Sequence, residues 1–342
     1  TGDGDGDGDG DGDGTGDGDG DGDEGGACDI TTTEVELKPT KVMLVLDKSR
    51  SMILNSWDDD SDPGTSEVTR WHSLHEVVDN LSTANSESME IGVQLFPSMD
   101  ATSQFDEACW VSEDPEVPFA PDNAAAILAA IPGADAMDLY GGTPATAGIV
   151  SALTHLEDNA NGEPAVMILV TDGAANCGAD YEGGALFAEY DDDLPLVVQS
   201  AYEDSGIPTY VVGIDINGLS DYPAVDPAEK LNELAAVGGA PREGAEAFYN
   251  AHDQVELTEV LDSIAAQVSC TVTLGQEPYM PHLLEIELDE ESIEWVEDCS
   301  EGSGWVYAED GVYDSITFCS DSCELMHDGA ELEAGLTCPP AP

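Results

Sequence analysis

An apolar run that ends in an aspartate opens the folded part of this chain: VMLVLDKSRSM, residues 42–52. Five apolar residues in succession predict a strand that is buried on both faces, as in a parallel sheet. The strand stops at Asp47, and Ser49 and Ser51 follow at alternate positions. The end of a buried strand therefore carries three oxygen-bearing side chains that need a partner.

Apolar strands and amphipathic helices alternate from residue 40 to residue 267. The expected strands are 42–46, 89–96, 165–170, 208–214 and 247–251, and the expected helices are 71–81, 122–131, 144–156, 193–204, 227–236 and 254–267. This alternation predicts an α/β fold, a doubly wound and mostly parallel sheet flanked by helices. A nucleotide-binding domain is the weaker fold alternative, because no G-K-[ST] follows the glycine-rich pieces LYGGTP and EGGA.

The composition divides the chain into three parts. Residues 1–26 alternate Asp and Gly without an apolar side chain, which predicts a disordered linker, with calcium binding by the tract as the less favoured alternative. Residues 27–269 hold the α/β pattern. Residues 270–342 break into short β-like segments and hold five of the eight cysteines, which predicts a small, disulfide-stapled β-rich appendage.

The charge excludes whole classes of partner. The 342 residues include 74 acidic and 7 basic side chains, a formal net charge of -67. Nucleic acids and anionic membrane surfaces are recognised by clustered Lys and Arg, so neither is an expected partner. A surface this acidic resembles those of salt-adapted or marine proteins, in which counterions screen the repulsion.

The cysteines and the start of the chain indicate export. Eight cysteines favour an oxidising compartment and up to four disulfides. A zinc site is the alternative, but Cys319 and Cys323 are the only closely spaced pair. The sequence has neither an initiator Met nor an apolar run of about 18 residues. We expect an extracytoplasmic protein, secreted or anchored at the cell surface, and leave open whether a lipid anchor precedes residue 1.

Two more pieces of sequence belong with the opening stretch. GGTP places Thr143 at the start of a helix, and VTDG places Asp172 at the end of another strand. Loops that follow parallel strands emerge at one edge of a sheet, so two carboxylates and three hydroxyls are expected to converge there. Such hard oxygen donors suit Mg²⁺, Mn²⁺ or Ca²⁺ better than zinc. The alternative, in which these residues only cap turns and helices, explains each piece better than it explains all three together.

DKSRSM, GGTP and VTDG resemble the metal-ion-dependent adhesion site of von Willebrand factor type A domains, written D-x-S-x-S, then T, then D. The resemblance spans about residues 40–268. It implies that Ser49, Ser51 and Thr143 coordinate a divalent ion, with Mg²⁺ expected first and Ca²⁺ or Mn²⁺ as alternatives. It also implies that Asp47 and Asp172 bind the ion directly or through water, and that one position remains for a partner's carboxylate.

The motif departs from the family pattern at Arg50, where relatives most often have Gly. Lys48 and Arg50 are two of only seven basic residues. They either attract an acidic partner or pair with the acidic loop at Asp58, Asp59, Asp60 and Asp62. That loop fails the EF-hand spacing, and a minor calcium site there is a less favoured alternative. Cys109 and Cys177 both lie near the expected metal face, and we expect a disulfide between them that stiffens its rim.

These features predict a binding protein and not an enzyme. The six histidines show no HExxH pattern, and no nucleophile elbow surrounds Ser49. We expect an adhesion module that captures a protein through a divalent ion completed by a partner carboxylate. The alternative is a structural surface or matrix protein in which the metal only stabilises the loops. A chaperone role like that of metal-chelatase subunits is a third reading, better suited to cytosolic relatives. The chain also resembles the exported, cysteine-containing type A proteins of Gram-negative bacteria.

Overall fold

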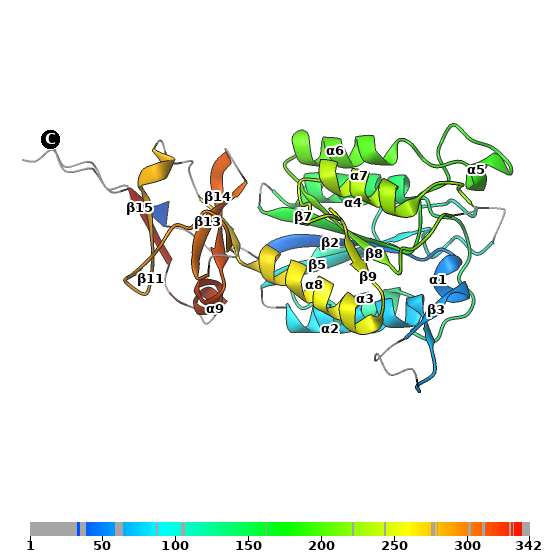
Figure 1. Cartoon of the computed structure of the whole chain (residues 1–342), viewed down its shortest axis with the longest axis horizontal. Helices are drawn as coiled ribbons and strands as arrows, with labels where there is room; N and C mark the ends of the chain where they lie inside the picture. Colours follow the sequence, from blue (N-terminus) through cyan, green and yellow to red (C-terminus); the bar gives the residue numbers. More distant parts are fainter. Residues whose placement is uncertain are drawn as a thin grey trace, which may run out of the picture.

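Figure 1 shows the computed structural model of the chain. The structure describes residues 33–34, 39–58, 64–86, 88–103, 107–161, 163–220, 222–242, 244–274, 278, 280–299, 302–309, 312–327, 330 and 332–336. Several expectations lie outside these residues: those for the Asp-Gly tract 1–26, for Cys28 and Cys338, and for Asp59, Asp60 and Asp62.

A six-stranded sheet forms the centre of the larger part of the molecule, and it confirms the predicted fold class. Its order is β6-β5-β2-β7-β8-β9. The strands are β2 (Thr40–Asp47), β5 (Met89–Phe96), β6 (Val117–Ala120), β7 (Ala165–Thr171), β8 (Thr209–Ile214) and β9 (Tyr249–Ala251). All neighbouring pairs are parallel except β5 and β6, which are antiparallel.

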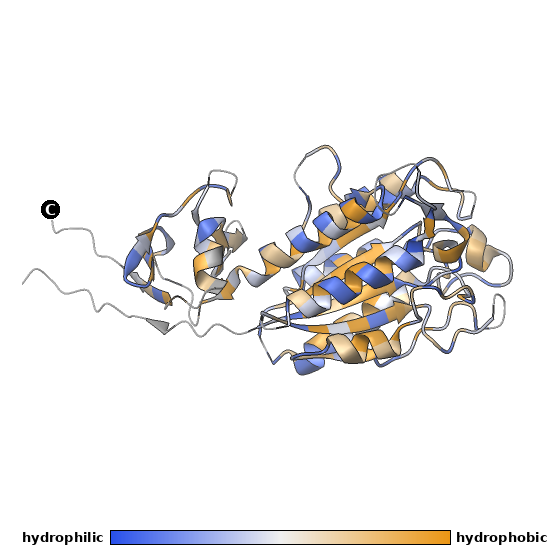
Figure 2. Cartoon of the chain, turned by 90° about the horizontal axis from the view of Figure 1, so that it is seen from below, coloured by the Kyte–Doolittle hydropathy of each residue, from blue (hydrophilic) through white to orange (hydrophobic). Residues whose placement is uncertain are grey.

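Helices cover both faces of this sheet (Figure 1). One layer holds α4 (Ala145–Asn159), α6 (Leu194–Glu203) and α7 (Pro227–Val237), and the other holds α2 (Arg70–Ala84), α3 (Ala124–Ala130) and α8 (Gln254–Ser269). Each layer has its own apolar core: Leu44 and Leu46 pack with Trp71 on one face, and Met43 and Val45 pack on the other. Figure 2 shows the apolar strands between the helices. The strand in the opening stretch is uniformly apolar because both of its faces are buried.

Polar caps explain where several helices begin. The Thr69 side chain accepts a hydrogen bond from the backbone of His72 at the start of α2, and Asp226 and Asp253 cap α7 and α8 in the same way. Pro144, the first residue of the expected helix 144–156, is instead the residue just before α4. The described residues also include elements too short to show a period: α1 (Ser51–Leu54), β3 (Ser56–Trp57), β4 (Val68–Thr69) and α5 (Ala185–Ala188).

The strand order locates the place where a ligand is expected. From the central strand β2 the chain first builds β5 and β6 on one side, then returns to place β7, β8 and β9 on the other. The order therefore reverses between β2 and β7. In open α/β sheets, ligands bind outside the carboxyl ends of the strands at such a switch point. Asp47 ends β2 there, and Asp172 directly follows β7.

The C-terminal part forms two small antiparallel sheets, as the predicted β-rich appendage requires. One contains β10 (Thr271–Thr273), β13 (Gly304–Glu309) and β14 (Val312–Cys319). The other contains β1 (Thr33–Glu34), β11 (Leu284–Leu288), β12 (Glu291–Ile293) and β15 (Leu332–Leu336). The 3₁₀ helix η1 (Pro281–Leu283) and α9 (Asp321–His327) complete this part, whose core includes Trp305 and Phe318.

Strand β1 lies within the predicted α/β domain by sequence but pairs with a strand of the C-terminal appendage. Thr33 and Glu34 pair with Ala334 and Glu333 of β15, so this early segment adds a strand to the C-terminal sheet. The chain then leaves that sheet and enters the larger part at β2. The boundaries placed at residues 27 and 270 stay predictions, but the pairing shows that residues from both ends of the sequence build the appendage.

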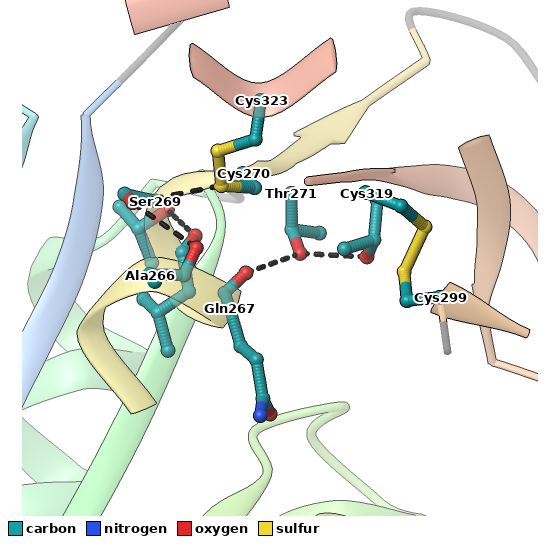
Figure 3. Close-up of a disulfide and its surroundings, with 11 residues drawn as sticks. Ala266, Gln267, Ser269, Cys270, Thr271, Cys299, Cys319 and Cys323 are labelled. Carbon is teal, nitrogen blue, oxygen red and sulfur yellow. Dashed lines mark hydrogen bonds between the residues drawn. A yellow bond between two sulfur atoms is a disulfide. The ribbon is translucent and has the colours of Figure 1, made fainter. Parts of the chain in front are cut away.

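Two disulfides staple the appendage, as Figure 3 shows. Cys270, which follows α8, bonds to Cys323 of α9, and Cys299 bonds to Cys319 at the end of β14. Thr271 extends the connection: its hydroxyl donates to the carbonyl of Gln267 and shares a hydrogen bond with Thr317. Cys319 and Cys323 therefore have separate disulfide partners, which excludes the zinc alternative for this pair.

Candidate metal centre

Asp47 lies at the bottom of the candidate site. It is fully buried at the end of β2. Its Oδ1 accepts the backbone N–H of Ser49 at 2.7 Å, and its Oδ2 accepts the hydroxyl of Thr171 at 2.7 Å. The first bond folds the loop back over the strand end, and the second joins β2 to the neighbouring strand β7. Asp47 is thus held rigidly at the switch point of the sheet.

A series of hydrogen bonds starts at Asp47 and runs through Ser49 and Ser51 to Asp172. The Ser49 and Ser51 hydroxyl oxygens lie 2.8 Å apart, and the Ser51 hydroxyl donates to Asp172 Oδ1 at 2.6 Å. Residues 121 positions apart in the sequence therefore meet in one hydrogen-bonded series. The spacing D-x-S-x-S places both serine side chains on the same side of the loop, toward the carboxylate that follows β7.

Thr143 lies in a third loop beside the first. Its backbone N–H donates to Asn176 Oδ1 at 2.8 Å, and the Arg50 N–H contacts the Gly141 carbonyl at 3.4 Å. Thr143 is 7% exposed. Among the described residues, no hydrogen bond joins its hydroxyl to the other four predicted ligands. The fold therefore links four of the five directly and brings Thr143 to the adjoining loop.

The two carboxylates of the site, Asp47 and Asp172, differ in the positive charge that lies next to them. Burial, and then the charge of Asp172, raise the pKa of Asp47 to about 7, although hydrogen bonds from Thr171 and Ser49 act in the opposite direction. The described ion pairs give Asp47 no cationic partner, whereas Asp172 Oδ2 accepts from Arg70 at 3.0 Å. A buried carboxylate without an ion-pair partner is an arrangement that a bound cation would relieve.

The residues fit a divalent ion that prefers oxygen. Serine hydroxyls and aspartate carboxylates meet within hydrogen-bond distance, with neither thiol nor imidazole among them. In the described part of the chain, no three or more His, Cys, Asp or Glu side chains are grouped to hold a metal, and this centre instead combines two carboxylates with hydroxyls. Ser49, Ser51 and Asp172 would hold an ion such as Mg²⁺, with Asp47 and Thr143 at its sides, and the ion would supply an electrophilic centre for a ligand oxygen.

Lys48 and Arg50 occupy different environments. Lys48 is 3% exposed; burial lowers the pKa of its ammonium, while the charges of Glu116, Asp47 and Asp138 act to raise it. Arg50 is only half-buried and precedes the short helix α1. Neither side chain is part of an ion pair among the described residues. Since most of the acidic loop lies outside those residues, its pairing with Lys48 or Arg50 stays a prediction.

The expected disulfide between Cys109 and Cys177 is confirmed. It joins the loop that follows β5 to the loop that follows β7, across 68 positions. The loop of Thr143 lies between them: the Gly142 N–H donates to the Ala108 carbonyl, and Thr143 bonds to Asn176. The disulfide therefore closes a frame around the third predicted metal loop.

Sequence reasoning missed four residues that organise this site. Thr171 and Asn176 hold Asp47 and Thr143, and Arg70 bridges Asp172 to Asp215. Thr171 and Asn176 stand one and four positions from Asp172, so their proximity was a usable signal. Arg70 was one of only seven basic residues, yet its partners are 102 and 145 positions away, which no local pattern reveals.

Replacing Asn176 with Ala is expected to loosen the Thr143 loop. Asn176 is 6% exposed, and the variant leaves the backbone N–H of Thr143 without its acceptor. A buried donor that loses its partner costs about 1–3 kcal/mol. We expect a corresponding loss in the free energy of unfolding, measured by urea denaturation. Asn80→Ala, at an exposed position of α2, is the control; equal losses in the two variants would contradict this role for Asn176.

Comparison with known proteins agrees with this architecture. The family model of the von Willebrand factor type A domain matches residues 41–263. The match covers well over half of the chain and includes every residue of the candidate centre. The chain belongs to the von Willebrand factor type A domain family. A search of curated protein sequences finds no match.

Solved structures with a similar fold include two bacterial pilus proteins. The pilus adhesin SpaC from Lactobacillus rhamnosus GG is 14% identical, with a TM-score of 0.48, over 89% of this chain and 40% of the adhesin. The minor pilin PilB from Streptococcus sanguinis is 17% identical, with a TM-score of 0.43, over 68% of this chain and 62% of the pilin. The chain thus spans less than two thirds of either protein. None of its described helices is long and apolar enough to cross a membrane.

Proposed function

We propose that this chain is an extracytoplasmic binding module that captures a protein ligand through a divalent metal ion, whose coordination is completed by a carboxylate of the partner. The observation that carries the proposal is the hydrogen-bonded series from Asp47 through Ser49 and Ser51 to Asp172 at the switch point of the sheet. It offers several oxygen donors to one ion at the edge where α/β folds bind ligands.

The charge around the site supports capture of an acidic group. A formal net charge of -67 repels acidic partners from most of the surface. The ion and the half-buried Arg50 would make the metal edge an exception. A Glu or Asp side chain would be attracted to this edge alone, which favours one orientation of the partner.

The hydrogen bonds of the serines favour binding over catalysis. Ser49 and Ser51 bond to each other and to a carboxylate, and no histidine in the described part of the chain bonds to either. A catalytic serine requires a neighbouring base to take its proton. Disulfides between Cys109 and Cys177 and within the appendage support an oxidising location outside the cytoplasm.

A structural role for the ion is the second candidate. The three predicted metal loops are already joined by hydrogen bonds and a disulfide, so an ion could serve only to strengthen this frame. Both candidates predict that the ion stabilises the fold. Only the binding role predicts that the loaded site retains a carboxylate-bearing ligand.

A panel of immobilised synthetic peptides, each with a single Glu among neutral residues, tests the binding role. We expect the full chain to be retained in Mg²⁺ by at least one Glu peptide and to be released by EDTA. Retention should also be lost on the matched Gln peptide, because an amide oxygen carries no net charge to place on the ion. Asp47→Ala is the control protein. Retention that survives EDTA or the Gln peptide would contradict ion-mediated capture, and retention by no Glu peptide would favour the structural role.

A further inference from the structure

A buried guanidinium lies directly behind the predicted ligand Asp172. Arg70 is the first residue of α2 and is 8% exposed. Its Nη1 donates to Asp172 Oδ2 at 3.0 Å, and its Nη2 donates to Asp215 Oδ2. Asp215 directly follows β8, so it emerges at the same edge of the sheet as Asp172. Neither Arg70 nor Asp215 belongs to the metal-site motif.

The two carboxylate oxygens of Asp172 have different partners. Oδ1 accepts the Ser51 hydroxyl and faces the predicted ion position, while Oδ2 is held by Arg70. The Asp172 side chain is only 1% exposed. Arg70 therefore orients this carboxylate without an ion, and Asp215 in turn holds the second nitrogen of the guanidinium.

The formal net charge of Asp47, Asp172, Asp215 and Arg70 is equal in size and opposite in sign to that of one divalent ion. Asp47, Asp172 and Asp215 carry three negative charges when ionised, and Arg70 carries one positive charge, which leaves a net charge of -2. An ion such as Mg²⁺ would make the loaded group neutral. Without Arg70 the loaded group would keep one negative charge, which would hold the ion more tightly but repel a partner's carboxylate.

We propose that Arg70 and Asp215 form a charge-setting pair behind the metal site. Arg70 positions Asp172, and its positive charge has two effects: it makes the ion-loaded site neutral, and it makes ion binding weaker. This inference rests on the proposed function and deepens it. It assigns the electrostatic balance of the site to two residues that hold no ion themselves. The expected ligand is one that a neutral ion site accepts, a single carboxylate.

Four full-length proteins test the pair by calorimetric titration with MgCl₂: wild type, Arg70→Gln, Asp215→Asn and the double variant. One unit charge about 6 Å from a divalent ion alters its affinity about tenfold when the surroundings screen it as strongly as water does, which sets the smallest effect expected here. We expect Arg70→Gln to bind Mg²⁺ about tenfold more tightly than wild type, and Asp215→Asn about tenfold more weakly. The double variant restores the net charge and should return to within about threefold of wild type.

Two further proteins keep the result decisive. Asp47→Ala shows how much Mg²⁺ other acidic groups bind, and this background is subtracted from the wild-type titration. Arg70→Lys retains the charge, so its affinity should stay within about threefold of wild type, which preserves the test if Arg70→Gln does not fold. Equal or weaker binding by Arg70→Gln, or a large loss in Arg70→Lys, would overturn the charge-setting role in a wild type that binds Mg²⁺. If the wild type shows no Asp47-dependent binding, the metal site itself fails.

Discussion

Mg²⁺ added to the chelated protein is expected to raise its melting temperature, and Asp47→Ala is expected to abolish the rise. An ion that binds only the folded state adds about 2.7 kcal/mol of stability at a concentration of 100 times its Kd. For a domain of about 200 residues, this corresponds to an increase of roughly 5–10 °C. Asp47 is the critical residue because it is the fully buried carboxylate that fixes Ser49 and the strand end. Thermal unfolding followed by circular dichroism measures the effect.

The control for this prediction is Asp158→Ala, which removes an exposed aspartate from α4. This variant should respond to Mg²⁺ as the wild type does, because exposed charges contribute only weakly and nonspecifically to ion binding. A repeat with Ca²⁺ shows which ion the site prefers. If wild type and Asp47→Ala gain equal stability, the ion acts elsewhere on the acidic surface and the metal assignment is wrong.

The loss of the disulfide between Cys109 and Cys177 is expected to have the second large effect. The bond closes a segment of 68 positions, and chain-entropy estimates for a loop of this length give about 4 kcal/mol. The double variant Cys109→Ala/Cys177→Ala should therefore melt roughly 10 °C lower than wild type. It should also bind Mg²⁺ more weakly, because Cys177 neighbours Asn176, whose side chain holds the Thr143 loop.

The appendage provides a matched control for this prediction. The bond between Cys299 and Cys319 closes 20 positions, for which the same estimate gives about 3 kcal/mol. Removing it should lower stability by a comparable amount and leave Mg²⁺ affinity unchanged. Should both double variants lose ion affinity equally, the frame around Thr143 would have no specific part in the site.

Much of the fold was predictable because burial on both faces leaves a local signal. The run from Val42 to Leu46 is apolar at every position, and the structure buries it between two helix layers. The face of α2 that carries Trp71 and Leu81 has the spacing of a helix packed on one side. Elements such as β1 and β4 were missed, because two residues are too few to show a period.

The candidate site was predictable only in part, for a related reason. D-x-S-x-S is a local pattern, and the rule that parallel strands end at one edge links it to Thr143 and Asp172. Arg70 left no such signal, and the closeness of Asn176 to Asp172 in the sequence did not reveal its role, because the hydrogen bonds of both residues depend on how distant loops fold together. The Cys109–Cys177 pairing could be expected because both cysteines lie in loops at that edge.

The sequence by itself determined the α/β architecture, the acidic character and the donor types of the metal site, because periodicity, composition and short spacings are properties of neighbouring residues. Only the tertiary structure decided that β1 joins the C-terminal sheet, that Asn176 holds Thr143, and that Arg70 links Asp172 to Asp215. These contacts join residues from 33 to more than 300 positions apart. Their energies depend on burial and mutual orientation, and both exist only after the chain has folded.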